Sequence, residues 1–177
     1  MEIFDLGLVD FKPAWDFQKE IFQAVKNANF SKALILCQHN PVITLGRTAS
    51  IKNILMDEQE LNLKGIQIYE IERGGDVTYH GPGQLTVYTI FNLNFFYKDI
   101  HSFLRYLEKV VIELLSDFGV CGLQRPGLTG VWVEKEKIAS IGIAIRNWIT
   151  FHGLSLNIKK DDLGNFSLIK PCGMDIE

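Results

Sequence analysis

The chain has 177 residues, of which 47% are hydrophobic and 22% charged, and its formal net charge is −3. These values predict a single globular domain over 1–177, and the lack of a basic patch argues against a nucleic-acid-binding protein. No apolar run approaches the roughly 18 residues that span a bilayer, and the acidic start does not resemble a signal peptide, so we expect no membrane association. The three cysteines form no C-x-x-C motif, which favours a reduced, cytoplasmic setting.

The apolar residues recur with strand or helix periodicity along most of the chain. In chain order this predicts a strand at 2–9, a helix at 10–29, strands at 33–37, 42–45, 66–71 and 84–93, a helix at 100–118, and strands at 130–134, 137–146 and 148–158. Residues 48–64 read as irregular, with one helical turn. The late strands follow one another without helices, which indicates an α+β domain with a mixed, largely antiparallel sheet flanked by helices.

A glycine-rich stretch, R-G-G-D-V-T-Y-H-G-P-G-Q-L-T-V-Y, runs from Arg73 to Tyr88. Paired glycines on both sides of a polar core suggest a loop moulded around a ligand, although a tight turn between two strands has the same composition. Neither the G-x-x-x-x-G-K-[ST] nor the G-x-G-x-x-G motif occurs in the chain, so a nucleotide fingerprint is not supported.

A few reactive or special side chains stand in distinctive surroundings. Lys137 opens the frame K-I-A-S-I-G, and Cys172 lies in P-C-G; on their own, they could equally be a turn lysine and a tail cysteine. His80 and His152 each precede a glycine, but no further ligands occur at metal-binding spacing, so we expect no metal. Gly153 interrupts the last predicted strand, which suggests a bulge or the close approach of a ligand. Cys37 lies in an apolar strand and is expected in the core.

Five frames in order carry a resemblance to a known family. They are H-N-P-V-I-T-L-G-R, R-G-G-D-V-T-Y-H-G-P-G-Q-L, G-V-W-V-E-K-E-K-I-A-S-I-G, F-H-G-L-S-L-N and P-C-G-M. Together they cover about residues 33–174 and are similar to the lipoyl(octanoyl) transferase family. The resemblance implies the catalytic-domain fold of the biotin and lipoate protein ligases.

The resemblance also implies an activity, partners and site residues. Family members move an octanoyl group from acyl carrier protein to a lysine of lipoyl domains, in lipoate biosynthesis and without a cofactor. These domains belong to the glycine cleavage H protein and the 2-oxoacid dehydrogenase acyltransferase subunits. The family cysteine, which forms an acyl-thioester, falls on Cys172, and the lysine that lowers its pKa falls on Lys137. The substrate-binding positions fall on Arg73, Gly74, Gly75, Asp76, Val77, Thr78, Tyr79, His80, Ser140, Ile141, Gly142, Gly153, Leu154 and Ser155.

The chain departs from the family pattern in small ways. Ser140 and Ser155 stand where the family often has alanine, and both should preserve a close-packed pocket. Family members usually continue well past P-C-G, which bears on how Cys172 is held but not on its assignment. Two alternative functions are an ATP-dependent lipoate or biotin-type ligase and a non-catalytic acyl-protein-binding module. The presence of both Cys172 and Lys137 favours the transferase.

Overall fold

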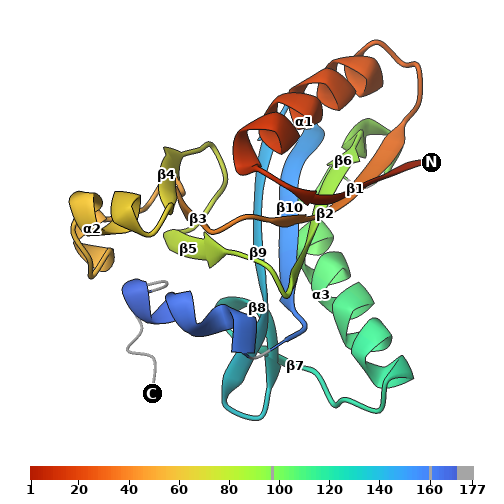
Figure 1. Cartoon of the computed structure of the whole chain (residues 1–177). Coiled ribbons are helices and arrows are strands. Elements are labelled where there is room, and N and C mark those ends of the chain that lie inside the picture. Colours follow the sequence, from red (N-terminus) through yellow and green to blue (C-terminus); the bar gives the residue numbers. More distant parts are fainter. Residues whose placement is uncertain (97, 160, 171–177) are drawn as a thin grey trace.

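The computed structural model describes residues 1–96, 98–159 and 161–170, and its largest element is a seven-stranded sheet (Figure 1). The strands lie in the order β1 (Glu2–Val9), β2 (Lys32–His39), β6 (Gln84–Phe91), β10 (Ile149–Asn157), β9 (Glu136–Arg146), β8 (Leu128–Val133) and β7 (Leu123–Arg125). Among the described strands of this sheet, β1 and β2 form the one parallel pair, and the other neighbours are antiparallel. The predicted mixed, largely antiparallel sheet is therefore confirmed.

A second, three-stranded sheet was not predicted. It has the order β4 (Gln67–Glu70), β3 (Val42–Leu45) and β5 (Val77–His80), with β3 parallel to β4 and antiparallel to β5. The interpretation of the part of the glycine-rich stretch before residue 84 as a loop was thus wrong for Val77–His80, which form β5. The four residues of β5 are too few to show the alternation that identifies a strand. The strand with which β5 pairs, β3, is more than thirty residues away, so the local sequence does not indicate the pairing.

Short helical segments cover the small sheet. They are η1 (Ile51–Asn53), α2 (Glu58–Leu63) and η3 (Asp161–Leu168), and a further turn, η2 (Leu93–Phe95), follows β6 (Figure 1). Leu61 and Ile169 join Ile43 and Tyr79 of the small sheet in one buried hydrophobic cluster. This cluster gives the small sheet a core of its own, and the C-terminal part of the described chain is packed against it.

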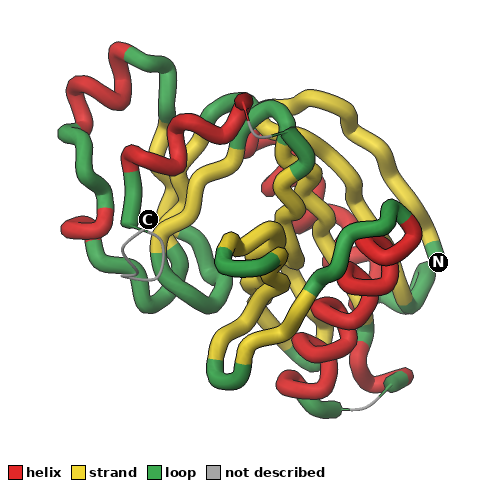
Figure 2. The backbone as a smooth tube through the Cα atoms, turned by 90° about the horizontal axis from the view of Figure 1, so that it is seen from below, coloured by secondary structure: helices red, strands yellow, loops and turns green. Residues whose placement is uncertain are grey.

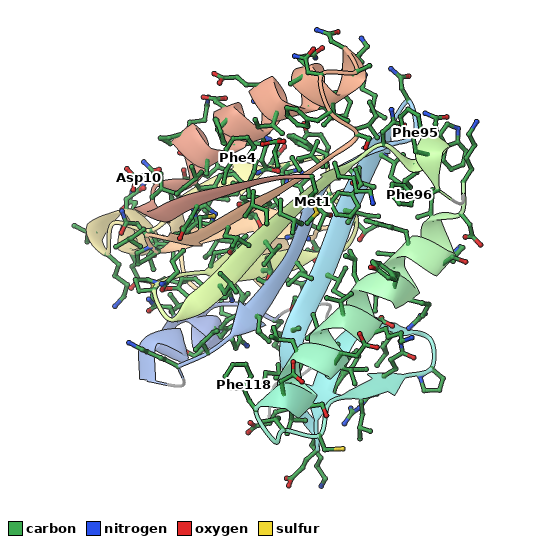
Figure 3. The ribbon with its side chains drawn as sticks, turned by 90° about the vertical axis from the view of Figure 1, so that its right-hand side faces the viewer. Met1, Phe4, Asp10, Phe95, Phe96 and Phe118 are labelled. Atoms are coloured by element: carbon green, nitrogen blue, oxygen red, sulfur yellow. The ribbon has the colours of Figure 1, made fainter. Side chains whose placement is uncertain are left out.

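The two long helices, α1 (Phe11–Lys26) and α3 (Ile100–Asp117), pack on opposite faces of the large sheet. Tyr88 and Ile90 of β6 belong to the cluster under α1, whereas Val87 and Phe91 belong to the cluster under α3. Because successive side chains of a strand point to opposite faces, the sheet lies between the helices, as Figures 2 and 3 show. Both helices were predicted from their apolar periodicity.

Local signals account for the limits of α3. The side chain of Asp99 accepts a hydrogen bond from the backbone N–H of Ser102, at 3.1 Å, and so caps the first turn. Gly119, at φ +74°, follows the last turn, in the left-handed conformation with which many helices end. No helix in the described ranges is long and apolar enough to cross a membrane.

Candidate active site

The glycine-rich stretch, distant in the sequence, meets the hairpin of β9 and β10 where these two strands pair. Gly142 lies opposite Gly153, Ile141 opposite Leu154, and Ser140 opposite Ser155. The glycine-rich stretch joins them, since the N–H of Gly74 donates to the carbonyl of Ile143 at 2.9 Å. The structure therefore places Gly74, near the start of the glycine-rich stretch, beside the other two groups of residues to which the family resemblance assigned substrate binding.

Arg73 ties the glycine-rich stretch to the small sheet. Its side chain is buried, with 8% of the residue exposed. Nη2 donates to the carbonyl oxygen of Thr44 at 2.7 Å and to its hydroxyl at 3.0 Å, and Nη1 donates to the carbonyl of Gly74 at 3.1 Å. The guanidinium thus holds backbone carbonyls together and shapes the loop from within.

His80 is held in a single tautomer by its neighbours. The amide nitrogen of Gln84 donates to Asn157 Oδ1 at 2.9 Å and to the carbonyl of Tyr79, so Gln84 Oε1 accepts from His80 Nδ1 at 2.6 Å. The unprotonated Nε2 lies 3.5 Å from the hydroxyl of Thr44. Burial lowers the pKa of His80 to about 3, so the ring is neutral near pH 7.

Other residues of the glycine-rich stretch shape the loop or fill the core. Val77 and Tyr79 face the hydrophobic cluster of the small sheet, and the Tyr79 hydroxyl accepts a hydrogen bond from Asn165 at 3.1 Å. Asp76 Oδ1 accepts from the backbone N–H groups of Ser50 and Val77, at 3.1 and 2.8 Å. The sequence did not distinguish these positions from those on the opposite side of β5.

Gly153 makes room for a neighbouring strand. A Cβ atom there would lie 2.1 Å from the carbonyl oxygen of Val87 on β6, and the pairing with both neighbouring strands is unbroken. The register shows no shift at this glycine, so the alternative of a bulge was wrong, whereas the close approach of a ligand stays a prediction. The preceding residue, His152, is buried, and its Nε2 lies 3.1 Å from Glu72 Oε2. Burial lowers the pKa of His152, although the Glu72 carboxylate opposes the shift.

A buried pair of polar side chains, His39 and Tyr88, was missed at the sequence level. His39 Nδ1 donates to the carbonyl of Val9 at 3.0 Å, which leaves Nε2 to accept from the Tyr88 hydroxyl at 2.6 Å. The centre of the His39 ring lies 5.9 Å from that of His80, so this contact connects the large sheet with the small one. Their strands are far apart in sequence, so only the H-N-P frame hinted at His39.

Cys37 confirms the prediction of a core thiol. It is 2% exposed, and its Sγ lies 3.4 Å from His39 Nε2. Burial raises the pKa of this thiol to about 12, so it stays protonated at physiological pH. Cys121 is exposed, and Cys172 lies outside the described residues.

Lys137 stands near the start of β9 and is half-buried. Its Nζ lies 5.0 Å from the centre of the Trp132 ring, a cation–π contact. Its carbonyl lies 3.5 Å from Asn157 Nδ2, which connects this end of β9 to the His80 cluster. Within the described part of the chain, no group of three or more His, Cys, Asp or Glu residues is placed to hold a metal ion.

The described chain ends close to the glycine-rich stretch. The N–H of Lys170 donates to the carbonyl of Asn53 at 2.7 Å, and the Asn53 side chain donates to Asp76 Oδ2 at 2.5 Å. Residue 170 is therefore anchored to the segment that Asp76 organises.

Comparison with known proteins identifies relatives over nearly the whole chain. The profile of the "Lipoyl protein ligase A/B catalytic domain" family matches residues 10–173. An octanoyltransferase of a Thermoanaerobacter species is 44% identical over 98% of this chain and 75% of its own length. An octanoyltransferase of Cytophaga hutchinsonii is 41% identical over 97% of this chain and 78% of its own. The structural match to the crystal structure of lipoate-protein ligase A bound with ATP covers 96% of this chain and 71% of the ligase chain. Its TM-score is 0.77 at 16% sequence identity, which shows a shared fold.

Proposed function

We propose that this chain, which belongs to the octanoyltransferase family and is an acyltransferase, transfers octanoyl groups in lipoate biosynthesis. Its catalytic domain is of the lipoyl protein ligase A/B type. The donor is octanoyl-acyl carrier protein. The acceptor is a lysine of a lipoyl domain, in the glycine cleavage H protein or a 2-oxoacid dehydrogenase acyltransferase subunit. The reaction needs no cofactor and takes place in the cytoplasm.

The observation that carries the proposal is the meeting of Gly142, Gly153 and Gly74 at one place. An octanoyl chain offers one carbonyl and otherwise only methylene groups, so its site needs apolar walls and backbone that comes close. The glycines supply such backbone on the face that meets Gly74, while Ile141 and Leu154, the neighbouring pair in the β9–β10 ladder, belong to the apolar cluster under α3 on the other face. Arg73 is hydrogen-bonded to Thr44 and Gly74 and maintains the shape of the loop, so we assign the chemical steps to other residues.

The first step exchanges one thioester for another. The thiolate of Cys172 attacks the octanoyl carbonyl, the bond to the carrier's sulfur breaks, and the carrier leaves as a thiolate that takes up a proton. A free thiol is only about 3% ionised at pH 7, because its pKa is about 8.5. The ammonium group of Lys137 stabilises the thiolate and so lowers that pKa. Since the energy of the thioester bond is retained, no ATP is consumed.

The second step forms the amide. The amine of the acceptor lysine attacks the Cys172 thioester, the C–S bond breaks, and Cys172 leaves as a thiolate. The attacking nitrogen loses a proton in this step, and Lys137, when neutral, accepts it. Lys137 is therefore charged during acylation and neutral during aminolysis.

Intact-protein mass spectrometry tests the proposal. Wild type, Cys172→Ala and Cys121→Ala are mixed with octanoyl-acyl carrier protein in the absence of ATP. Cys121 is the matched control because it is an exposed thiol with no proposed role. We expect one added octanoyl group on wild type and on Cys121→Ala, and none on Cys172→Ala.

Two results would contradict the proposal. Acylation of Cys172→Ala would assign the nucleophile elsewhere. An absence of acylation in every variant, followed by lipoyl-domain modification once ATP and free octanoate are added, would make the protein a ligase. Failure with ATP as well would favour the non-catalytic binding module.

A further inference from the structure

The side chain of Lys137 is aimed by an irregularity in its strand. Val131 of β8 pairs with Ala139 of β9, whereas the next residue, Trp132, pairs with Lys137. Between these two pairs, one step along β8 corresponds to two residues of β9, which runs in the opposite direction. Ile138 is therefore the extra residue of a β-bulge. Bulges bend a strand and change the direction of its side chains, and they are frequent beside active sites. This one brings the Lys137 amine over the Trp132 ring.

The backbone of Gly130 forms the floor under the Lys137 side chain. A Cβ atom at Gly130 would lie 2.4 Å from Lys137 Cε and 3.2 Å from Lys137 Nζ. Gly130 has φ +140°, a conformation that favours glycine. The last methylene and the amine of Lys137 thus lie in a hollow that exists only because position 130 has no side chain.

A buried carboxylate on α3 holds this floor in place. Glu108 is 0% exposed, and its Oε1 accepts a hydrogen bond from the N–H of Gly130 at 2.9 Å. Its other oxygen accepts from Arg105 Nη1 at 2.6 Å and from Gln124 Nε2 at 2.9 Å. Burying a carboxylate is costly unless it is paired and hydrogen-bonded, and here each donor is supplied. The anchored floor makes position 130 unable to move away from the lysine.

We propose that Glu108 and Gly130 are positioning residues that direct the Lys137 amine toward the reacting thiol of the acyltransferase. Lysine is a flexible point charge, and side-chain entropy opposes holding it in one place. The bulge at Ile138 and the backbone of Gly130 restrict the lysine side chain, and Glu108 holds Gly130 in place. This inference rests on the role that the proposed function gives to Lys137 and Cys172.

The test compares two glycines of one hairpin. Gly130→Ala places a methyl group 2.4 Å from Lys137 Cε and 2.6 Å from the carbonyl oxygen of Ala139, whereas Gly127→Ala, also at a positive φ of +77°, places one where nothing lies within 4 Å. The pH dependence of Cys172 alkylation by iodoacetamide, followed by peptide mass spectrometry, gives the midpoint of thiolate formation without any octanoyl substrate. Cys121 in the same molecule is the internal reference.

We expect the Cys172 midpoint to rise by about one pH unit in Gly130→Ala, because an opposite charge within a few ångströms shifts a pKa by about that much. It should stay at the wild-type value in Gly127→Ala. In a Lys137→Met background, Gly130→Ala should cause no additional shift, since the charge that it displaces is already gone. Equal midpoints in the two alanine variants, or an equal shift in the Lys137→Met background, would overturn the inference.

A second pair of variants covers the case in which Gly130→Ala does not fold. Glu108→Gln replaces a carboxylate that accepts three hydrogen bonds with an amide, whose NH₂ group cannot accept them, and so weakens the hold on Gly130. The midpoint of Cys172 ionisation should therefore rise, as in Gly130→Ala. Glu113→Gln, on an exposed residue of the same helix, is the control. Unchanged midpoints in both would contradict the anchoring role. If wild type and Lys137→Met have the same midpoint, the proposed use of Lys137 fails, and this inference with it; if they differ while Gly130→Ala and Glu108→Gln match wild type, only the inference fails.

Discussion

Two polar regions near the glycine-rich stretch differ in how much water reaches them. Arg73 and His80 are each 8% exposed, and their side chains form hydrogen bonds inside the protein, with Thr44 and Gln84 respectively. Around Lys137, the side chain is half-buried and lies across a glycine and an aromatic ring. The first region is closed, and the second is within reach of a reactant.

The difference indicates that the region around Arg73 and His80 maintains the structure of the loop, whereas Lys137 takes part in the reaction. A neutral histidine with a pKa of about 3 and an arginine bound to carbonyls cannot readily exchange protons near pH 7, so they maintain the loop. A half-exposed amine can approach a thiol and an incoming amine. Changes in the closed region should therefore affect stability, and changes in the open region should affect rates.

The largest effect is expected for Arg73→Met. It leaves the buried carbonyl and hydroxyl of Thr44 without the guanidinium that donates to them, so we expect the free energy of unfolding to fall by about 3 kcal/mol. Urea unfolding followed by circular dichroism measures it. Arg47→Met, on the exposed arginine of the next turn, should change the free energy by less than about 0.5 kcal/mol. Similar values for the two variants would remove the distinction between the regions.

Lys137→Met should act on rate instead of stability. Without the ammonium the Cys172 thiol returns toward its ordinary pKa, and we expect acyl-enzyme formation at pH 7 to slow by about 20-fold. Rapid-quench mass spectrometry with octanoyl-acyl carrier protein measures the rate. Lys135→Met, in the exposed turn before β9, is the control and should retain the wild-type rate. A wild-type rate in Lys137→Met would contradict the assignment.

The smallest effect concerns the pH dependence of stability. The pKa of His80 is about 3 when folded and about 6.5 when unfolded, so between these values the unfolded chain binds more protons. Stability should therefore be lost as the pH falls from about 6.5 toward 3, and burial gives His39 and His152 the same direction. We expect His80→Gln to flatten the decline in urea midpoint between pH 7 and pH 5. The exposed His101→Gln should keep the wild-type slope, and an unchanged slope in both variants would argue against His80.

The amount that could be predicted differed between elements for physical reasons. The helices at 11–26 and 100–117 and most strands of the large sheet were predictable, because their apolar residues repeat with the period of the element. The strand Val77–His80 and the short strand Leu123–Arg125 were not, since each is too short to show a period. The eight-residue 3₁₀ segment Asp161–Leu168 has the polar composition of a loop and was also missed.

The sequence by itself determined the family, the candidate nucleophile and the identity of Lys137, because these depend on residue types within short frames. Only the tertiary structure decided which side chains surround them. It joined Glu108 of α3 to Gly130 of β8 and Gly130 to Lys137 of β9, and it placed His39 against Tyr88. Such contacts arise from hydrogen bonds and packing between strands and helices that are distant along the chain, so they cannot be predicted from the periodicity of one segment.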